Sequence, residues 1–323
     1  MDKKDKKIIY ELDFDSRQTL SQIGRKVGLS EQLVSYRINN LVKDGIITAF
    51  FAVIDIARMG YTSYKVVVQL TNTDRKKFDE IIAHLSRHPD ILWLASCGSR
   101  WDLTFNIMAR NIIEFSNIFN SIKLKFPGQI QNYNILITME AFHYGRKYLS
   151  DKKEDIVRVP YFGKEAEIAK LDKHDLKILD ILSENSRLNL LEISKNTNLA
   201  ANTISNRVKN LKKAGVIQTF KPLVHVEKIG YQTYKLLIKL HNITSEKENK
   251  IKAFANQHEN IVFLIRLVGP WDMELEVEVE NREKLQQIVM ELRNIFPEII
   301  KEIETMPIYH DYRYNYFPKE LAR

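Results

Sequence analysis

The chain has 323 residues, 44% of them hydrophobic and 28% charged, which is ordinary for a globular protein. Its single cysteine, Cys97, excludes an intramolecular disulfide and a cysteine-based zinc site. No apolar run approaches the ~20 residues that span a membrane, and the charged N-terminal residues are not followed by the apolar segment of a secretory signal. These features predict a cytoplasmic protein. The formal net charge of +8 favours a polyanionic partner, of which nucleic acid is the commonest.

Residues 1–50 predict a module of three short helices. Apolar residues at helical spacing begin the first helix. Thr19–Gln22 is a capping box that opens the second helix, and Ser30 is placed to cap the third. The third helix ends before Gly45, because glycine adopts without strain the left-handed conformation that follows many helices.

The third helix has two distinct faces. Val34, Ile38 and Leu41 lie at i, i+4 and i+7 and should pack inward. The opposite face is rich in amides and hydroxyls, which hydrogen-bond to base edges and phosphates, and its only carboxylate is Glu31 at its start. A solvated helix face would more often mix Glu and Lys, so this face favours contact with DNA. Its outward residues are Gln32, Ser35, Tyr36 and Asn39.

The second module changes from helical to alternating periodicity. Residues 60–144 predict strands and helices in the order β-α-β-β-α-β, which is a ferredoxin-like arrangement. The expected strands cover residues 64–70, 91–97, 103–109 and 135–139, and the expected helices cover residues 75–86 and a segment from Asn111 to the residue before Phe126-Pro127.

The two modules occur twice. Residues 5–150 recur as residues 175–320, with a constant offset of 170 and no gap. A register held over that length indicates two copies of one complete folding unit, which we expect to lie around a pseudo-twofold axis. The framework repeats: Arg37 recurs as Arg207, Gly45 as Gly215, and Trp101-Asp102 as Trp271-Asp272. The outward face of the third helix has diverged to Asn202, Ser205, Asn206 and Lys209.

The chain is therefore predicted to be an α+β protein of two tandem units. The charged segment 145–170, which contains Pro160 and Gly163, indicates a linker. The aromatic stretch 309–317 is too apolar for a free tail and is expected to pack. Pairing of the two units within one chain or across chains stays open, so the prediction is an intramolecular pseudo-dimer or a homodimer. The expected domains are residues 1–50 and 171–220 (helix-turn-helix) and residues 60–144 and 230–323 (ferredoxin-like effector and dimerisation modules).

An ordered set of residues carries a family resemblance. It comprises Leu29-Ser30, the segment Val34-Ser35-Tyr36-Arg37-Ile38-Asn39-Asn40-Leu41, Gly45-Ile46-Ile47, their counterparts in the second copy, and the turn Gly269-Pro270-Trp271-Asp272. In these residues the chain resembles the Lrp/AsnC (feast/famine) family of transcription regulators over nearly its whole length. The resemblance implies winged helix-turn-helix units that bind double-stranded DNA. It also implies ferredoxin-like modules that dimerise through their sheets and often bind an amino-acid effector.

The resemblance places the DNA contacts on the third helix of each copy. Arg37 and Arg207 lie beside the packed stripe and are equally suited to brace the fold through a salt bridge. The full candidate set is Gln32, Ser35, Tyr36, Arg37, Asn39, Asn202, Ser205, Asn206, Arg207 and Lys209.

The resemblance also implies effector contacts at the Gly-x-x-Asp turn, at Asp102, Gly269 and Asp272. In the first copy Ser99 stands where the turn's glycine would be, so the second copy is the stronger candidate. The alternative is a turn aspartate that accepts hydrogen bonds from backbone N–H groups. Trp101 and Trp271 are expected to be packing residues.

No motif in the sequence predicts a cofactor or a metal. His84 and His88 have the i, i+4 spacing of metal ligands, but Pro89 ends the helix and no third ligand is well placed, so a solvated pair is expected.

An enzyme is the alternative from a different class. Siroheme decarboxylases are built from units of the same kind, sometimes two in one chain. The glutamates of residues 273–280 alternate on one strand face and would repel a carboxylate substrate, which favours the regulator over the enzyme. A third hypothesis for the function is a module that only mediates interactions, without binding DNA.

Overall fold

The computed structural model describes residues 1–150, 159–163 and 166–322, and it contains two copies of an α+β unit. The helix-turn-helix units consist of α1 (Lys3–Phe14), α2 (Leu20–Val27) and α3 (Glu31–Lys43) in the first copy and α6 (Lys173–Glu184), α7 (Leu190–Thr197) and α8 (Ala201–Lys213) in the second. The predicted caps are present: Thr19 and Gln22 form the capping box of α2, and the Ser30 hydroxyl accepts a hydrogen bond from the Leu33 N–H at the start of α3.

The second module of each copy has the predicted β-α-β-β-α-β order. In the first copy the elements are β2 (Thr62–Leu70), α4 (Arg75–Arg87), β3 (Ile91–Cys97), β4 (Leu103–Ala109), α5 (Ile112–Lys125) and β5 (Ile130–His143). In the second copy they are β8 (Gln232–Leu240), α9 (Ser245–Gln257), β9 (Ile261–Val268), β10 (Met273–Val279), α10 (Arg282–Ile295) and β11 (Ile300–Tyr314). The last strand of each module is much longer than the 135–139 segment that the sequence predicts.

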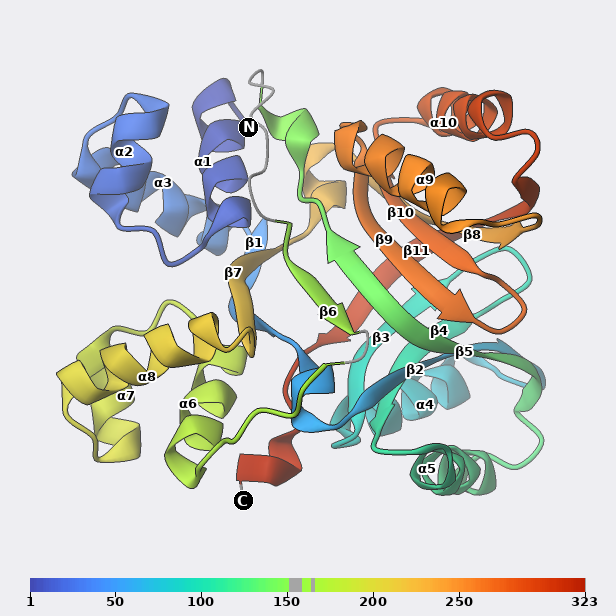
Figure 1. Cartoon of the computed structure of the whole chain (residues 1–323), viewed down its shortest axis with the longest axis horizontal. Coiled ribbons are helices and arrows are strands. Elements are labelled where there is room, and N and C mark those ends of the chain that lie inside the picture. The colour runs from blue at the N-terminus through green and yellow to red at the C-terminus, as the bar shows by residue number, and fades with distance from the viewer. Residues whose placement is uncertain (151–158, 164–165, 323) are drawn as a thin grey trace.

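The long last strands join the two modules. β5 pairs with β9 of the second copy, and β11 pairs with β3 of the first copy. The resulting strand order is β2-β4-β3-β11-β8-β10-β9-β5, and β5 also pairs with β2, so these eight strands form a closed ring. The helices α4, α5, α9 and α10 cover its outside (Figure 1). Closure leaves an interior between the two half-sheets that belongs to both copies.

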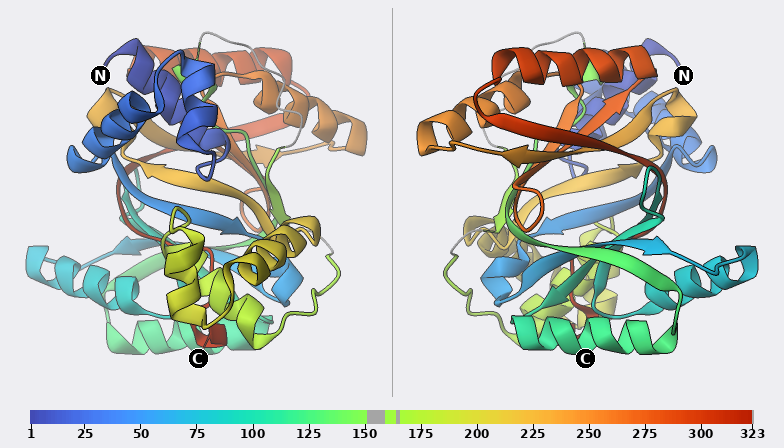
Figure 2. Two further views of the ribbon diagram at one scale, coloured as in Figure 1. Left: turned by 90° about the vertical axis from the view of Figure 1, so that its left-hand side faces the viewer. Right: turned by 90° about the vertical axis from the view of Figure 1, so that its right-hand side faces the viewer.

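The two helix-turn-helix units are joined in the same reciprocal way. β1 (Ile47–Ile54) and β7 (Ile217–Val224) leave the third helices and pair antiparallel, with Ala52 opposite Phe220. Each helical core is completed by the other copy: Val224 and Tyr231 pack in the first unit. Figure 2 shows the two units on the same side of the molecule, with β1 and β7 between them. Pairing therefore occurs within one chain, and the molecule is an intramolecular pseudo-dimer.

The segment that the sequence predicts to be a linker is partly packed into the fold. Leu149 is buried, the Arg146 side chain is 12% exposed, and β6 (Tyr161–Gly163) pairs with the end of β5. Residues 151–158 and 164–165 of this segment lie outside the described residues. The described residues also form four short 3-10 helices: η1 (Ile56–Met59), η2 (Lys147–Leu149), η3 (Val226–Ile229) and η4 (Lys319–Ala322).

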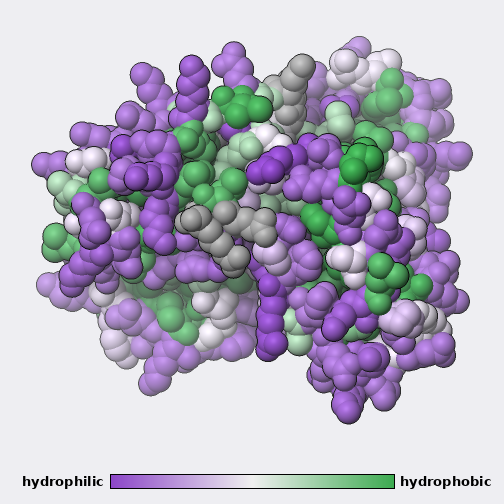
Figure 3. All heavy atoms as spheres, turned by 90° about the horizontal axis from the view of Figure 1, so that it is seen from below, coloured by the Kyte–Doolittle hydropathy of each residue, from purple (hydrophilic) through white to green (hydrophobic). Residues whose placement is uncertain are grey.

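The C-terminal aromatic stretch packs, as the sequence predicts. Its first part is the end of β11, and Phe317 is fully buried in the core of the second helix-turn-helix unit. Seen from below, the surface is mainly hydrophilic, with hydrophobic residues in scattered groups (Figure 3). Across the described residues, no helix has both the length and the apolar character needed to cross a membrane.

Candidate nucleic-acid interface and ligand cavity

The third helix of the first copy presents its predicted polar face to solvent. Val34, Ile38 and Leu41 are buried, so the helix packs through the expected stripe. Tyr36 is 62% exposed, which leaves an aromatic ring and a phenol hydroxyl standing free on the surface. Gln32 and Asn39 are exposed as well, and Ser35 is half-buried beside them. This surface can donate hydrogen bonds to, and accept them from, the base edges in a major groove.

The third helix of the second copy has the same position and length but a different face. Asn202, Asn206 and Lys209 are exposed, and Ser205 is half-buried. Its N-cap residue is Ala200, which offers no side-chain acceptor where Ser30 has a hydroxyl. The two candidate DNA-binding surfaces, the outward faces of α3 and α8, are therefore equivalent in geometry and different in chemistry.

Arg37 and Arg207 brace the helical units. The Arg37 guanidinium lies 2.7 Å from both Asp2 and Asp5, the residues of the capping box at the start of α1. Arg207 makes the equivalent ion pairs with carboxylates at the start of α6. A phosphate contact through either arginine would have to compete with these ion pairs, so their place among the DNA contacts stays a prediction.

The turn aspartates adopt the alternative role that the sequence left open. The Asp102 carboxylate accepts a hydrogen bond from the Leu70 N–H at 2.7 Å, and Asp272 accepts the equivalent one from the Leu240 N–H at 2.8 Å. A side chain at Gly269 would meet the Ile135 carbonyl oxygen at 2.7 Å, so the close approach of β5 requires glycine there. In the structure the two aspartates accept backbone hydrogen bonds and Gly269 allows close packing. Effector binding by these residues stays a prediction.

Trp101 and Trp271 lie inside the ring of strands. Each is 5% exposed and packs in the core between the two half-sheets. The Trp101 indole N–H donates to Glu304 at 3.0 Å. Both tryptophans are packing residues, as the sequence predicts.

The alternating glutamates of β10 are paired, which corrects the argument that they repel carboxylates. Glu274 bonds to both Lys65 and Lys235, the equivalent lysines of the two copies. Burial alone would raise the pKa of Glu274, but attraction to Lys235 and Lys65 outweighs it and lowers this pKa to about 2. Glu278 is paired with Arg146 at 3.0 Å. The lysines that neutralise these glutamates lie on strands of both copies, so the sequence of β10 alone could not predict the pairing.

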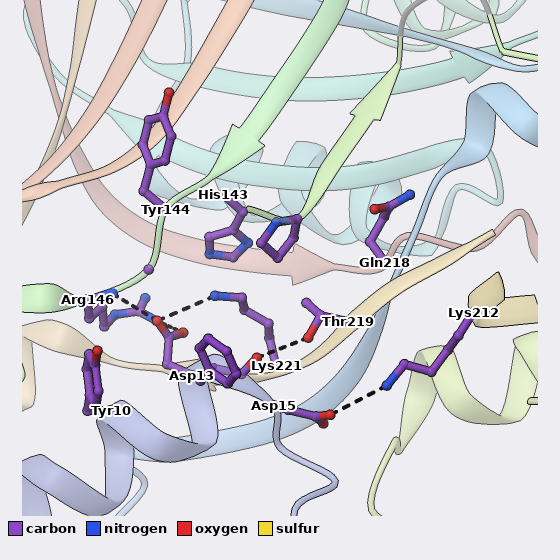
Figure 4. A pocket seen from close by; sticks show the side chains of 13 residues that line it. Tyr10, Asp13, Asp15, His143, Tyr144, Arg146, Lys212, Gln218, Thr219 and Lys221 are labelled. Carbon is purple, nitrogen blue, oxygen red and sulfur yellow. Dashed lines mark hydrogen bonds and ion pairs between the residues drawn. The ribbon is translucent and has the colours of Figure 1, made fainter. Parts of the chain in front are cut away.

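A cavity of about 210 Å³ lies where the first helix-turn-helix unit meets the strand modules. Figure 4 shows its polar side chains, which come from the end of α1, the end of β5 with the residues after it, β7 and α8. Asp13 is its centre: Oδ1 lies 3.0 Å from Arg146 Nη1, and Oδ2 lies 3.5 Å from Lys221 Nζ. Lys212 and Asp15, also 3.5 Å apart, line the same cavity.

His143 brings an unpartnered ring nitrogen to this cavity. It is buried, stacks on Phe263 with ring centroids 3.8 Å apart, and its Nδ1 has no hydrogen-bond partner within the described part of the chain. Burial, together with the positive charges of Lys221 and Arg146, holds the pKa of His143 well below its ordinary value. The imidazole is therefore neutral near pH 7 and able to accept or donate one hydrogen bond to an occupant.

Sequence reasoning missed this cavity, because its residues come from three separate stretches of the chain, 10–15, 143–160 and 212–221, and match no motif. One signal was available in the duplication. The charged cavity residues Asp13, Arg146 and Lys221 correspond, at the offset of 170, to Ser183, Tyr316 and Phe51.

Comparisons with known proteins agree on the helical units. A family model described as winged helix-turn-helix DNA-binding matches residues 1–48 and again residues 171–218. The HTH-type transcriptional regulator FL11 of Pyrococcus furiosus is 32% identical over 119 residues, which cover 37% of this chain and 78% of that protein. An uncharacterised HTH-type transcriptional regulator of Pyrococcus abyssi is 35% identical over 128 residues, which cover 37% of this chain and 85% of that protein.

A solved structure matches the two-unit arrangement as a whole. The siroheme decarboxylase NirDL aligns with a TM-score of 0.63 over 99% of this chain and 98% of that chain, at 13% identity. At that identity the likeness establishes a shared fold. The single-chain pair of units is therefore an architecture that a second protein also adopts.

Proposed function

The chain belongs to the Lrp/AsnC-like family of HTH-type transcriptional regulators as a tandem duplication, and on this premise we propose that it is a sequence-specific DNA-binding transcription regulator. One observation carries the proposal. Two third helices stand at equivalent positions, each exposing a polar face that is nearly free of carboxylates, and the β1–β7 pair joins them in one chain.

The arrangement supports binding of two half-sites by one molecule. Each unit inserts its third helix into a major groove, with half-sites about one helical turn, ~10 base pairs, or a multiple of it apart. Because the exposed residues of α3 and α8 differ, the operator is an asymmetric pair of half-sites. Amides and hydroxyls read the bases, and Lys209 adds a phosphate contact in the second unit only.

A small effector is part of the proposal. By analogy with the family, an amino acid would contact the turn at Gly269 and Asp272. Asp272 is already bonded to the Leu240 N–H and to Lys239 at 3.1 Å, so a ligand there would use its remaining acceptor capacity. Loss of an effector response in the D272N variant, with its DNA affinity unchanged, would support this site.

The test of DNA binding combines selection of bound sequences from a random pool with footprinting on the selected DNA. The variant S35A/Y36A/N39A should lose protection of one half-site, and N202A/N206A/K209A should lose protection of the other. The matched control is R75A/K76A on α4, which removes exposed positive charge from the module side and should leave both half-sites protected. Enrichment of no sequence, or protection that neither triple variant alters, contradicts the proposal.

A siroheme decarboxylase-like enzyme is the second candidate, and the full-length likeness to NirDL favours it. The pairing of Glu274 with two lysines removes one objection to it. Incubation of the protein with siroheme, followed by mass spectrometry of the tetrapyrrole, tests it. Loss of carbon dioxide from the substrate would establish the enzyme, and an unchanged mass with an unchanged absorption spectrum would exclude that activity.

A further inference from the structure

The duplication supplies an internal control for the cavity in Figure 4. Both copies must connect a helix-turn-helix unit to the same kind of strand module. The first copy makes this joint with the buried charges of Asp13 and Lys221 and the nearly buried Arg146. The fold itself does not demand those charges, because the second copy makes the equivalent joint without them.

Aromatic packing replaces the charges in the second copy. Phe51 takes the place of Lys221, and its ring lies 5.6 Å from Tyr316 and 5.1 Å from Tyr314. Ser183 takes the place of Asp13 and donates to the Asp180 carbonyl at 2.7 Å. Since well-packed apolar residues are often as stabilising as a buried ion pair, stability alone does not explain the charged joint of the first copy.

The charged joint has unused hydrogen-bonding capacity in residues that line the cavity. The Lys221 ammonium has three N–H donors, and its ion pair with Asp13 is a long one, at 3.5 Å. The Nδ1 of His143 and the Nε of Arg146 are buried without a partner in the parts of the chain that the structure describes. Buried polar groups are normally satisfied, so two unpartnered nitrogens beside an ammonium with spare donors indicate an occupant.

The charge and size of the cavity define the class of occupant. Its lining carries three cationic and two anionic side chains, and Glu278, outside the lining, pairs with Arg146. The Lys221 ammonium, whose own ion pair with Asp13 is long, is therefore the cationic group best placed to bind an anion beside a neutral His143. Its volume of about 210 Å³ is below the ~300–1,000 Å³ of sites for drug-sized ligands. We propose that this cavity binds one small organic carboxylate, held by the Lys221 ammonium and the His143 imidazole, with Lys212 at the cavity wall.

The position of the site means that ligand binding should affect the two helix-turn-helix units unequally; this step rests on the proposed DNA-binding function. Asp13 belongs to α1 of the first unit and is held by Arg146 and, at a longer distance, by Lys221. A carboxylate bound to Lys221 competes with Asp13 for the same ammonium. It therefore changes how the first helix-turn-helix unit packs against the strand modules. The second unit is held by its aromatic joint and by Phe317, and neither involves the cavity. The second unit reaches the cavity through Lys212 of α8, which is paired with Asp15. The ligand therefore alters half-site contacts by α3 more strongly than those by α8.

Calorimetric or NMR titration of the full chain with matched acid and amide pairs tests the binding step. The probes are acetate and acetamide, lactate and lactamide, and benzoate and benzamide. At least one acid should bind ten times or more tightly than its amide, because a charge-assisted hydrogen bond to an ammonium is lost in the amide. Equal behaviour of acid and amide in all three pairs overturns the proposal.

Variants locate the site. K221M should weaken binding of the acid at least tenfold. Should K221M not fold, K212Q answers the same question at a half-exposed position, and K213Q, its exposed neighbour on α8, is the matched control. The proposal predicts weaker binding for K212Q and wild-type binding for K213Q, and equal effects of the two variants would overturn it.

Footprinting with and without the tightest probe separates the two proposals. A larger change in protection at the α3 half-site than at the α8 half-site supports the unequal effect, whereas equal changes at both half-sites contradict it. If the protein protects no DNA, the proposed function fails, and the acid-over-amide titration still decides whether the cavity is a ligand site.

Discussion

The hydroxyl oxygens of Ser16 and Ser186 lie 3.2 Å apart, fully buried, and the two residues are equivalents at the offset of 170. Equivalent residues meet in this way only on a twofold axis, so the pseudo-twofold axis of the molecule passes between them. Arg17 donates to the Ser186 carbonyl, and Arg187 donates to the Ser16 carbonyl at 2.6 Å. This reciprocal set fastens the two helix-turn-helix units to each other beside the β1–β7 pair.

The serine pair should behave as one unit in unfolding. S16A or S186A alone leaves a buried hydroxyl without its partner and should lower the free energy of unfolding by about 1–3 kcal/mol. The double variant S16A/S186A should cost less than the sum of the two, because it leaves no hydroxyl unpaired. Urea unfolding of the four proteins measures this coupling, and strictly additive effects would show that the two hydroxyls do not interact.

The N-caps of the third helices should respond in opposite directions. A200S gives α8 the acceptor that Ser30 gives α3 and should stabilise the second helix-turn-helix unit by about 1 kcal/mol. S30A should destabilise the first unit by about the same amount. Amide hydrogen exchange reports the two units separately, and a change in protection in the unmutated unit would contradict the local explanation.

The buried cluster around Glu274 should make stability depend on acid pH. The pKa of Glu274 in the folded protein is lowered to about 2 from the ordinary 4.5, so its contribution is fully present above about pH 4.5 and is lost as the pH falls toward 2. The loss is on the order of 3 kcal/mol for a shift of this size. Thermal unfolding should show a steeper decline across this window in the wild type than in E274Q, which lacks the titrating group.

E274Q should also be less stable than the wild type at pH 7. It leaves the buried ammonium groups of Lys65 and Lys235 with less compensation, and breaking such a cluster typically costs about 3–5 kcal/mol. Wild-type stability of E274Q at neutral pH would mean that the lysines find other partners.

Giving α8 the outward residues of α3 should make the preferred operator more symmetric. The variant N202Q/N206Y/K209N gives α8 the outward residues of α3, since Ser205 already matches Ser35. Sequences selected by this variant should approach an inverted repeat, whereas the wild type should select two different half-sites. A symmetric preference in the wild type, or an unchanged one in the variant, would place sequence recognition elsewhere.

Local signals were enough to place most elements. The capping boxes, the N-cap serine and the alternating strands act over four to ten residues, and the strands Ile91–Cys97 and Leu103–Ala109 have the predicted bounds. β5 was predicted too short, since its residues 140–143 are held by β9 and β6 of a different part of the chain. The polar faces of α3 and α8 followed from helical periodicity, so the candidate DNA surface was available before the fold was known.

By itself, therefore, the sequence determined the duplicated α+β unit, its family resemblance and the divergence of its two reading faces, because the offset of 170 and the helical period are properties of residue order. The tertiary structure alone decided that the copies pair within one chain, that the glutamates of β10 are neutralised, and that Asp13, Arg146 and Lys221 enclose a cavity with His143. These outcomes depend on contacts between residues more than 100 positions apart. Such contacts form only when strand pairing closes the ring, and no local pattern encodes them.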